Sequence, residues 1–152
     1  MNRRARLAAG AAMTGAVAAA TVATGLVVLP RVERAAGEAV YQAHCATCHG
    51  LNLKGATIWQ ERLPNGRWPP PPHDATGHTW HHDDDLLFNV VKHGPQAILG
   101  ADYQTDMPAF GQALSDRQIV AVLSYIKSTW PEEQAAYQRL MNRPASERLI
   151  QP

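Results

Sequence analysis

The residues with the clearest chemistry in this sequence are the two cysteines and the histidine of Cys45-Ala46-Thr47-Cys48-His49. Residues three and four positions apart share one face of a helical turn, so both sulfurs and the imidazole address the same ligand. This spacing is the attachment signature of a c-type haem, in which each thiol forms a thioether with a vinyl group and the histidine ligates the iron. We therefore expect Cys45, Cys48 and His49 to bind one covalent haem c.

Two other uses of a Cys-x-x-Cys pair fit the surrounding sequence less well. A thioredoxin-like redox pair opens a helix after a strand, whereas residues 38–44, before Cys45, have a helical pattern. A zinc site needs further thiolates or paired histidines at ligand spacing, and the chain has no second cysteine pair. Having only two cysteines also excludes a disulfide-dense scaffold.

The sequence around this motif resembles class I c-type cytochromes over about residues 36–130. Gly37 and Tyr41 match the small and aromatic positions of that family's N-terminal helix, which crosses the C-terminal helix at the position of Tyr125. The resemblance implies a small all-α, cytochrome c-like helical domain wrapped around one covalent haem. It also implies a methionine as the sixth ligand of the iron.

Met107 is the methionine that this resemblance assigns to the iron. It lies in a loop, residues 105–110, directly before a strong helical pattern, where the family places its distal ligand. A thioether is a soft, neutral ligand that raises the reduction potential relative to a second histidine. The alternatives are that Met107 only fills a gap in the core, or that His78 or His81 takes its place on the iron. Met141, in a polar terminal segment, is expected at the surface or in packing.

Residues 51–82 form a long connection rich in glycine, proline, histidine and tryptophan. Long loops inside compact domains usually have a function, and we expect this one to wrap the haem edge. The side chains of Trp59, Trp68 and Trp80 offer apolar ring surface and an indole N–H for a haem propionate. The alternative is that these large rings simply pack. The prolines at positions 69–72 indicate a stiff turn.

Four histidines gather in the same part of the chain: His73, His78, His81 and His82. Copper or zinc could use two or three of them. The other interpretation is that they donate to propionates or to solvent near the start of the next helix. The sequence contains no complete ligand set for such a metal. A second metal is therefore an alternative and not the expected role of these histidines.

Apolar periodicity and capping residues predict helices over about residues 32–48, 83–93, 115–130 and 131–141. The second of these helices has an apolar stripe that we expect in the core: Leu86, Leu87, Val90 and Val91. The third begins with a capping box formed by Ser115 and Gln118, with Leu114 stapled onto Ile119. Its apolar face comprises Ile119, Val122, Leu123, Ile126 and Trp130.

The chain has 152 residues, of which 45% are apolar and 18% charged, which fits one folded domain with a tail. Its formal charge of +1 argues against a protein that binds nucleic acids by neutralising phosphates. Three of the 14 basic residues are Arg3, Arg4 and Arg6, so residues 31–152 carry 11 basic and 13 acidic side chains. The main domain is therefore mildly acidic.

Residues 1–30 are expected to be a transmembrane anchor or a signal peptide. The uncharged segment 7–29 would span roughly 35 Å as a helix, compared with ~30 Å for the hydrocarbon core of a bilayer. The arginines would hold its start in the cytoplasm, and small residues at 18–20 offer a cleavage site. In both interpretations the haem domain (31–130) and a C-terminal helical extension (131–152) face the periplasm of a bacterium.

The expected function is one-electron transfer between larger redox complexes at the membrane, with no nucleic acid and no small-molecule substrate as a partner. The sequence contains no nucleophile–base pair or open metal position, so the chain is not expected to be an enzyme by itself. Two alternatives stay open. One is a haem subunit held permanently in a larger oxidoreductase, and the other is a gas-sensing or peroxidase-like protein with an open sixth site.

Overall fold

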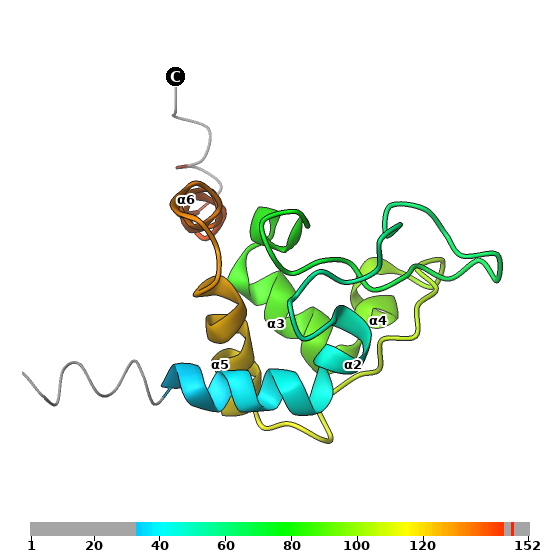
Figure 1. Ribbon diagram of the computed structural model, residues 1–152, viewed down its shortest axis with the longest axis horizontal. Coiled ribbons are helices and arrows are strands. Elements are labelled where there is room, and N and C mark those ends of the chain that lie inside the picture. Colours follow the sequence, from blue (N-terminus) through cyan, green and yellow to red (C-terminus); the bar gives the residue numbers. More distant parts are fainter. Residues whose placement is uncertain (1–32, 145–146, 148–152) are drawn as a thin grey trace, which may run out of the picture. The chain divides into compact units, whose positions relative to one another are not determined.

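The computed structural model describes residues 33–144 and residue 147. These residues form helices connected by long loops, which confirms the predicted all-α class (Figure 1). In this part of the chain the only β-pairing is an isolated parallel bridge between Trp68 and Thr105. No helix among the same residues is long and apolar enough to cross a membrane. The anchor or signal expected at residues 1–30 lies outside the described residues.

The described part of the chain begins with a helix over residues 33–44, which a turn at Cys45 separates from α2 (Ala46–His49). A long connection follows, in which the only helical turn is the 3-10 element η1 (Thr79–His81). The remaining helices are α3 (Asp84–His93), α4 (Pro95–Leu99), α5 (Asp116–Lys127) and α6 (Glu132–Met141). The four predicted helices are therefore confirmed to within a few residues, with a break in the first. The sequence pattern does not predict η1 or α4.

The predicted caps of α3 and α5 are confirmed. Asp83 accepts a hydrogen bond from the backbone N–H of Leu86 at 2.8 Å. In the capping box, Ser115 Oγ accepts from the backbone N–H of Gln118 at 3.4 Å, and Gln118 Oε1 accepts from the backbone N–H of Ser115 at 3.0 Å. These bonds satisfy amide groups that a helix leaves without partners at its start. At the end of α3, Gly94 adopts φ 84°, which glycine tolerates best, and a new helix starts directly after it.

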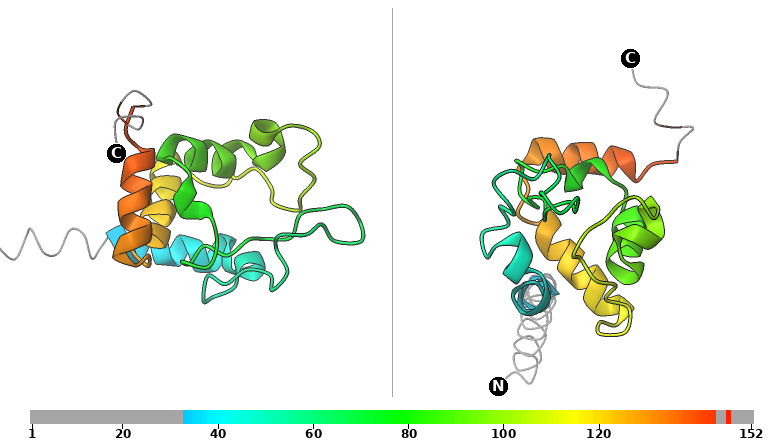
Figure 2. Two further views of the ribbon diagram at one scale, coloured as in Figure 1. Left: turned by 90° about the horizontal axis from the view of Figure 1, so that it is seen from above. Right: turned by 90° about the vertical axis from the view of Figure 1, so that its right-hand side faces the viewer.

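The helix over residues 33–44 crosses α5 at Gly37 (Figure 2). A Cβ atom on Gly37 would lie 2.7 Å from the carbonyl carbon of Ala121 and 2.9 Å from Cβ of Tyr125, so glycine is needed for this approach. Beside the crossing, the rings of Tyr41 and Tyr125 have centroids 5.6 Å apart. Tyr41 is fully buried, and its hydroxyl donates to the carbonyl of Gly50 at 2.9 Å. The crossing expected at Gly37, Tyr41 and Tyr125 is confirmed.

Two clusters of buried apolar side chains form the core, and α5 contributes to both. One cluster consists of Tyr41, Ala46, Leu53, Val122, Tyr125, Ile126 and Trp130. The other consists of Leu87, Leu114, Ile119 and Leu123. The predicted apolar face of α5 is buried throughout. The predicted stripe on α3 is different, because only Leu87 is buried in the core.

A polar network in which only Gln138 is buried fixes α6 to the start of α3. Gln138 is 2% exposed, and its amide donates to Asp84 Oδ1 at 2.6 Å. Lys127 of α5 donates to both carboxylate oxygens of Asp84, at 2.7 and 2.8 Å. The side-chain oxygen of Asn142 accepts from the backbone N–H of Asp84 at 2.8 Å. Since hydrogen bonds to a charged group are stronger than neutral ones, Asp84 joins α3, α5 and α6.

Replacing Asp84 with asparagine is expected to lower the free energy of unfolding by about 1 kcal/mol at pH 7, after allowance for the partial exposure of this carboxylate. Burial acts to raise the pKa of Asp84, but Lys127, with Gln138 and Asn142, outweighs it and lowers the pKa from 3.8. The stabilisation is therefore present above pH 3.8 and is lost as the pH falls through the pKa of the folded state. Urea unfolding at neutral and acid pH measures it.

Asp85→Asn is the matched control for this substitution. Asp85 is exposed in the same first turn of α3, and its carboxylate makes no hydrogen bond or ion pair among the described residues. We expect this control to change the free energy of unfolding by less than about 0.5 kcal/mol. Equal losses in the two variants, or a loss in Asp84→Asn that persists unchanged in acid, would contradict the role given to Asp84.

Candidate functional site

A cavity of about 310 Å³ lies between the helices and the loops that connect them. Its helical walls are largely apolar and comprise Leu86, Leu87, Val90, Val91, Val122, Leu123 and Ile126. The four side chains predicted to attach the haem and ligate its iron also line it: Cys45, Cys48, His49 and Met107. The expectation that the whole α3 stripe belongs to the core holds only in part. Leu87 is buried in the core and Val91 packs against it, whereas Leu86 and Val90 are half-buried and line this cavity.

Cys45 and Cys48 are free thiols at the cavity wall. Cys45 is half-buried in the turn before α2, and burial together with the neighbouring Cys48 raises its pKa to about 11. Redox-active Cys-x-x-Cys pairs instead contain a thiol whose pKa is lowered. Burial therefore keeps the Cys45 thiol neutral, unlike the thiol of a redox-active pair.

His49 is 7% exposed, and its Nδ1 lies 2.9 Å from the carbonyl oxygen of Pro71. Because a carbonyl oxygen only accepts, Nδ1 carries the hydrogen and Nε2 keeps its lone pair. Burial lowers the pKa of His49, while the hydrogen bond to Pro71 acts in the opposite direction. The ring is therefore neutral at pH 7. A neutral imidazole held through its second nitrogen is the usual state of a histidine that ligates a metal.

The proline turn at residues 69–72 carries the Pro71 carbonyl to His49. The carbonyl of Pro70 accepts from the backbone N–H of Ala56 at 2.9 Å. Gly55, at φ 55°, packs so closely that a Cβ atom there would lie 2.5 Å from the carbonyl carbon of Pro71. The sequence predicts the stiffness of this turn but not its contact with His49, since that contact spans 22 positions and uses a backbone atom.

His73 stacks on His49, with ring centroids 4.0 Å apart and an interplanar angle of 23°. Its own Nδ1 lies 2.9 Å from Thr79 Oγ1. Its backbone N–H donates to the carbonyl of Leu53 at 2.7 Å, and its carbonyl accepts from the indole of Trp130 at 2.8 Å. His73 is thus fixed at three points and fixes the plane of the His49 ring.

Met107 is half-buried on the loop between α4 and α5 and lines the cavity. Its backbone N–H donates to Thr105 Oγ1 at 3.3 Å. Further along, the backbone N–H groups of Phe110 and Gly111 donate to carbonyl oxygens at the end of α3, at 3.0 and 2.9 Å. The loop therefore brings a soft thioether to the same space as His49. Met141, by contrast, ends α6 and does not line the cavity.

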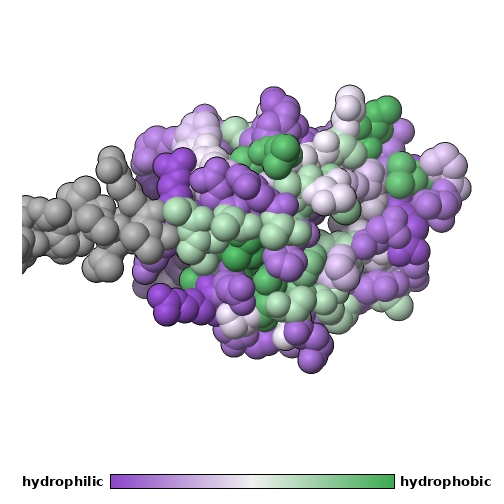
Figure 3. Space-filling model, turned by 60° about the horizontal axis from the view of Figure 1, so that its bottom comes forward, coloured by the Kyte–Doolittle hydropathy of each residue, from purple (hydrophilic) through white to green (hydrophobic). Residues whose placement is uncertain are grey.

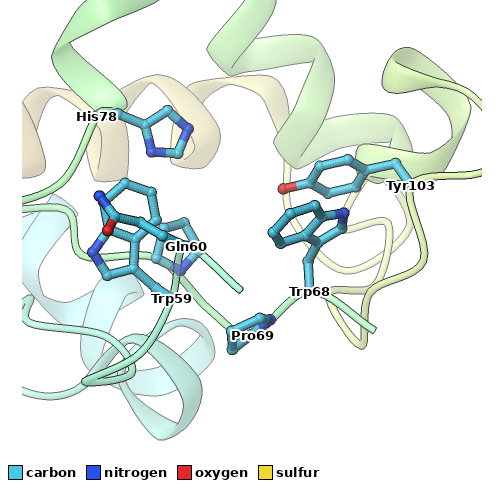
Figure 4. Close-up of a pocket in the computed structure, with 7 residues that line it drawn as sticks. Trp59, Gln60, Trp68, Pro69, His78 and Tyr103 are labelled. Atoms are coloured by element: carbon cyan, nitrogen blue, oxygen red, sulfur yellow. The ribbon is translucent and has the colours of Figure 1, made fainter. Parts of the chain in front are cut away.

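The three tryptophans considered for the propionates lie in different settings. Trp68 lines the cavity and stacks on Tyr103, with centroids 6.0 Å apart. Trp59 lines a smaller pocket of about 280 Å³ and stacks on His78, with centroids 5.0 Å apart (Figure 4). Trp80 lines neither pocket and packs against the first core cluster.

The smaller pocket continues the cavity, since Trp68, Pro69, Pro71, His78 and Tyr103 line both. Nδ1 of His78 is buried and has no hydrogen-bond partner among the described residues. Such atoms are rare in folded proteins because they cost free energy, so a polar group of a bound cofactor would suit this one. The Tyr103 hydroxyl is directed toward the Trp59–His78 pair (Figure 4), and burial raises its pKa, which keeps it a donor. Sequence analysis did not single out Tyr103.

A second metal was an open alternative for the four histidines of this region. In residues 33–144 and 147, no group of three or more His, Cys, Asp or Glu side chains is arranged to hold a metal ion. The rings of His78 and His81 stack on tryptophans instead. His78 and His82 line the cavity, whereas His81 does not.

Comparison with known proteins identifies the family and the cofactor of the chain. Residues 32–126 match the family model described as "Cytochrome C oxidase, cbb3-type, subunit III". The chain belongs to this cytochrome c family. Its cofactor is therefore covalently bound haem c, and its activity is electron transfer. The resemblance, the fold and the cofactor inferred from the sequence are confirmed.

The cytochrome is also similar to the gluconate 2-dehydrogenase cytochrome c subunit of Pantoea cypripedii. The two are 31% identical over 96 residues, which cover 62% of this chain. The chain spans only 20% of the length of that relative. No solved structure matches the cytochrome.

The residues present fit a haem c. Two thiols would meet the two vinyl groups, a neutral imidazole would offer Nε2 to the iron, and a thioether lines the same cavity. The apolar side chains of α3 and α5 suit the macrocycle, and the unpartnered nitrogen of His78 suits a carboxylate at its edge.

Proposed function

We propose that Cys45 and Cys48 hold the haem through two thioethers, and that His49 Nε2 and Met107 Sδ ligate its iron. The observation that carries this proposal is that all four side chains line one cavity. When bound, the haem supplies an iron that cycles between two oxidation states. The chain orients the group, shields it with apolar side chains and sets its reduction potential through the ligands and their hydrogen bonds.

We propose that the propionates lie toward the smaller pocket. Trp59 and Trp68 supply ring surface and indole N–H groups there, and His78 and Tyr103 supply further donors. Trp80 lines neither pocket, but its indole N–H is buried without a hydrogen-bond partner among the described residues, so it is kept as a further candidate donor.

We infer that the cytochrome passes single electrons between larger redox proteins. Leu63 and Leu99 line the cavity and are 41% and 48% exposed, so apolar side chains lie at its rim, where a partner protein would dock. Figure 3 shows one face of the molecule, on which apolar side chains lie between hydrophilic ones. We expect neither a nucleic acid nor a small-molecule substrate as a partner.

A second candidate is that the cytochrome is a haem subunit held permanently in an oxidoreductase. The similarity to a cytochrome c subunit of a dehydrogenase favours it. Purification of the full chain in mild detergent distinguishes the two roles. A stable complex with a catalytic subunit supports the held subunit, and a cytochrome that separates from its partners supports the shuttle.

We further propose that the haem domain (residues 31–130) and its extension (residues 131–152) face the periplasm of a bacterial cell. The basis is the sequence of residues 1–30, in which three arginines precede an uncharged segment, as in a membrane anchor or a signal peptide. N-terminal sequencing of the mature protein distinguishes an anchor, which keeps these residues, from a cleaved signal.

The test of the proposed function is a redox titration of the full chain matured with haem. A His/Met-ligated carrier is expected to show one reversible one-electron wave and a near-infrared methionine-to-iron band in its ferric form. Carbon monoxide should bind the ferrous form slowly, because the iron has no free position. Rapid binding together with a missing methionine band would instead indicate an open sixth site and would overturn the electron-carrier assignment.

A further inference from the structure

Two loop segments, residues 62–68 and 102–106, are joined by polar contacts at the open side of the haem domain (Figure 1). Arg67 is central among them. Its Nε lies 2.6 Å from Oδ1 of the exposed Asp106, in an ion pair that lacks hydrogen-bond geometry, and its Nη2 donates to the backbone carbonyl of Thr105. The backbone N–H of Trp68 donates to the carbonyl of Gln104 at 2.7 Å. We name these contacts the Arg67 brace.

We call the loop between α4 and α5, which carries Met107, the methionine loop. The Arg67 brace holds the part of this loop that precedes Met107. The side that follows Met107 is anchored to the end of α3 through Phe110 and Gly111. Between the end of α4 and Met107, two hydrogen bonds go back to Gln96 in α4, and all others to distant parts of the described chain go to residues 62–68. They include one from Arg62 to the carbonyl of Asp102, at 3.1 Å. Without the brace, the loop before Met107 would depend on local turns.

The other end of the brace leads to the histidine side of the cavity. Residues 62–68 continue directly into the proline turn, whose Pro71 carbonyl accepts from His49. Arg67 and Trp68 therefore link the segment that holds His49 to the segment that carries Met107. An arginine suits this task, because its planar guanidinium contacts a carboxylate and a carbonyl at once, which the single ammonium of lysine does less well.

We propose that Arg67 is a positioning residue that keeps Met107 against the haem iron. This inference rests on the proposed ligation by Met107. The ferrous iron binds carbon monoxide only when Met107 has left it, so the rate of binding reports how often the methionine loop opens. Weakening the brace raises that rate.

The test compares variants of the full, haem-loaded chain by stopped-flow binding of carbon monoxide to the ferrous form. Arg67→Gln removes both side-chain contacts and is expected to raise the observed rate about tenfold, the change that corresponds to ~1.4 kcal/mol. Arg67→Lys keeps the positive charge but cannot contact the carboxylate and the carbonyl at once. Its rate is expected to lie between those of Arg67→Gln and wild type. Asp106→Asn weakens the ion pair from the other side and should raise the rate in the same direction. The ferric methionine band should weaken in parallel.

Charge alone does not explain such a result. Arg67→Gln removes a positive charge near the haem and Asp106→Asn removes a negative one, so a purely electrostatic role would shift the reduction potential in opposite directions. Carbon monoxide is neutral, and both variants are expected to bind it faster.

Arg139→Gln is the matched control, because it breaks an exposed arginine–carboxylate pair of similar length, Arg139 with Glu132 at 2.5 Å, outside the brace. It should leave the rate unchanged.

The outcomes separate this inference from the ligand assignment. If Met107→Ala binds carbon monoxide no faster than wild type, the assignment of Met107 is wrong. If Met107→Ala is fast while Arg67→Gln and Asp106→Asn keep the wild-type rate, Met107 is the ligand and the role of Arg67 is wrong. Should Arg67→Gln fail to retain haem, Arg67→Lys and Asp106→Asn decide by the same rate.

Discussion

Replacing Met107 with alanine is expected to abolish the near-infrared methionine-to-iron band of the ferric cytochrome. The reduction potential should fall by on the order of 0.1–0.3 V, because a thioether favours ferrous iron and axial ligands shift haem potentials over about 0.8 V. Carbon monoxide should also bind the ferrous variant rapidly, since the sixth position is then open. Absorption spectroscopy with a redox titration measures these changes together.

Met141→Ala is the control for this substitution. Met141 is the other methionine after residue 30, and it ends α6 without lining the cavity. We expect its replacement to leave both the band and the potential as in wild type. If the band survives in Met107→Ala, another methionine ligates the iron. If the wild type already lacks the band, a different side chain is the ligand, and His78 is the first to examine because it lines the cavity.

Replacing Gly37 with valine is expected to lower the free energy of unfolding by about 3 kcal/mol. A Cβ atom would meet the Ala121 backbone at 2.7 Å and Tyr125 Cβ at 2.9 Å, and backbone atoms of a packed helix cannot move aside. The crossing also places Tyr41, which joins the first core cluster beside the haem motif. Thermal or urea unfolding of the haem-loaded protein measures the loss.

Ala39→Val provides the comparison on the same helix. Ala39 is exposed, so valine there costs only its lower helix propensity, about 0.5 kcal/mol. Similar losses in the two variants would show that the penalty comes from the β-branched side chain, and would contradict close packing at Gly37.

The features that could be predicted from the sequence are those whose cause is local. The Ser115–Gln118 capping box and the Asp83 cap each involve residues three positions apart, and both form as predicted. The apolar face of α5 is set by helical periodicity and is buried. The Cys-x-x-Cys-His motif is equally local, since one turn of chain brings its three side chains to one cavity.

The features that could not be predicted depend on contacts between distant residues. The Pro71 carbonyl has the same chemistry as every other backbone carbonyl, and only the fold brings it to His49. The α3 stripe has the periodicity of a core, but periodicity does not distinguish protein from cofactor as the partner of an apolar face. The Arg67 brace likewise joins segments about forty positions apart.

The most direct test of the central claim is the intact mass of the full chain under denaturing conditions, after expression in a host that matures c-type cytochromes. The expected mass is that of the polypeptide plus one haem, with Cys45 and Cys48 both resistant to alkylation because their sulfurs are thioethers. A polypeptide of unmodified mass in which both cysteines take up the alkylating reagent would contradict covalent haem attachment, and with it the proposed axial ligands and the role of Arg67.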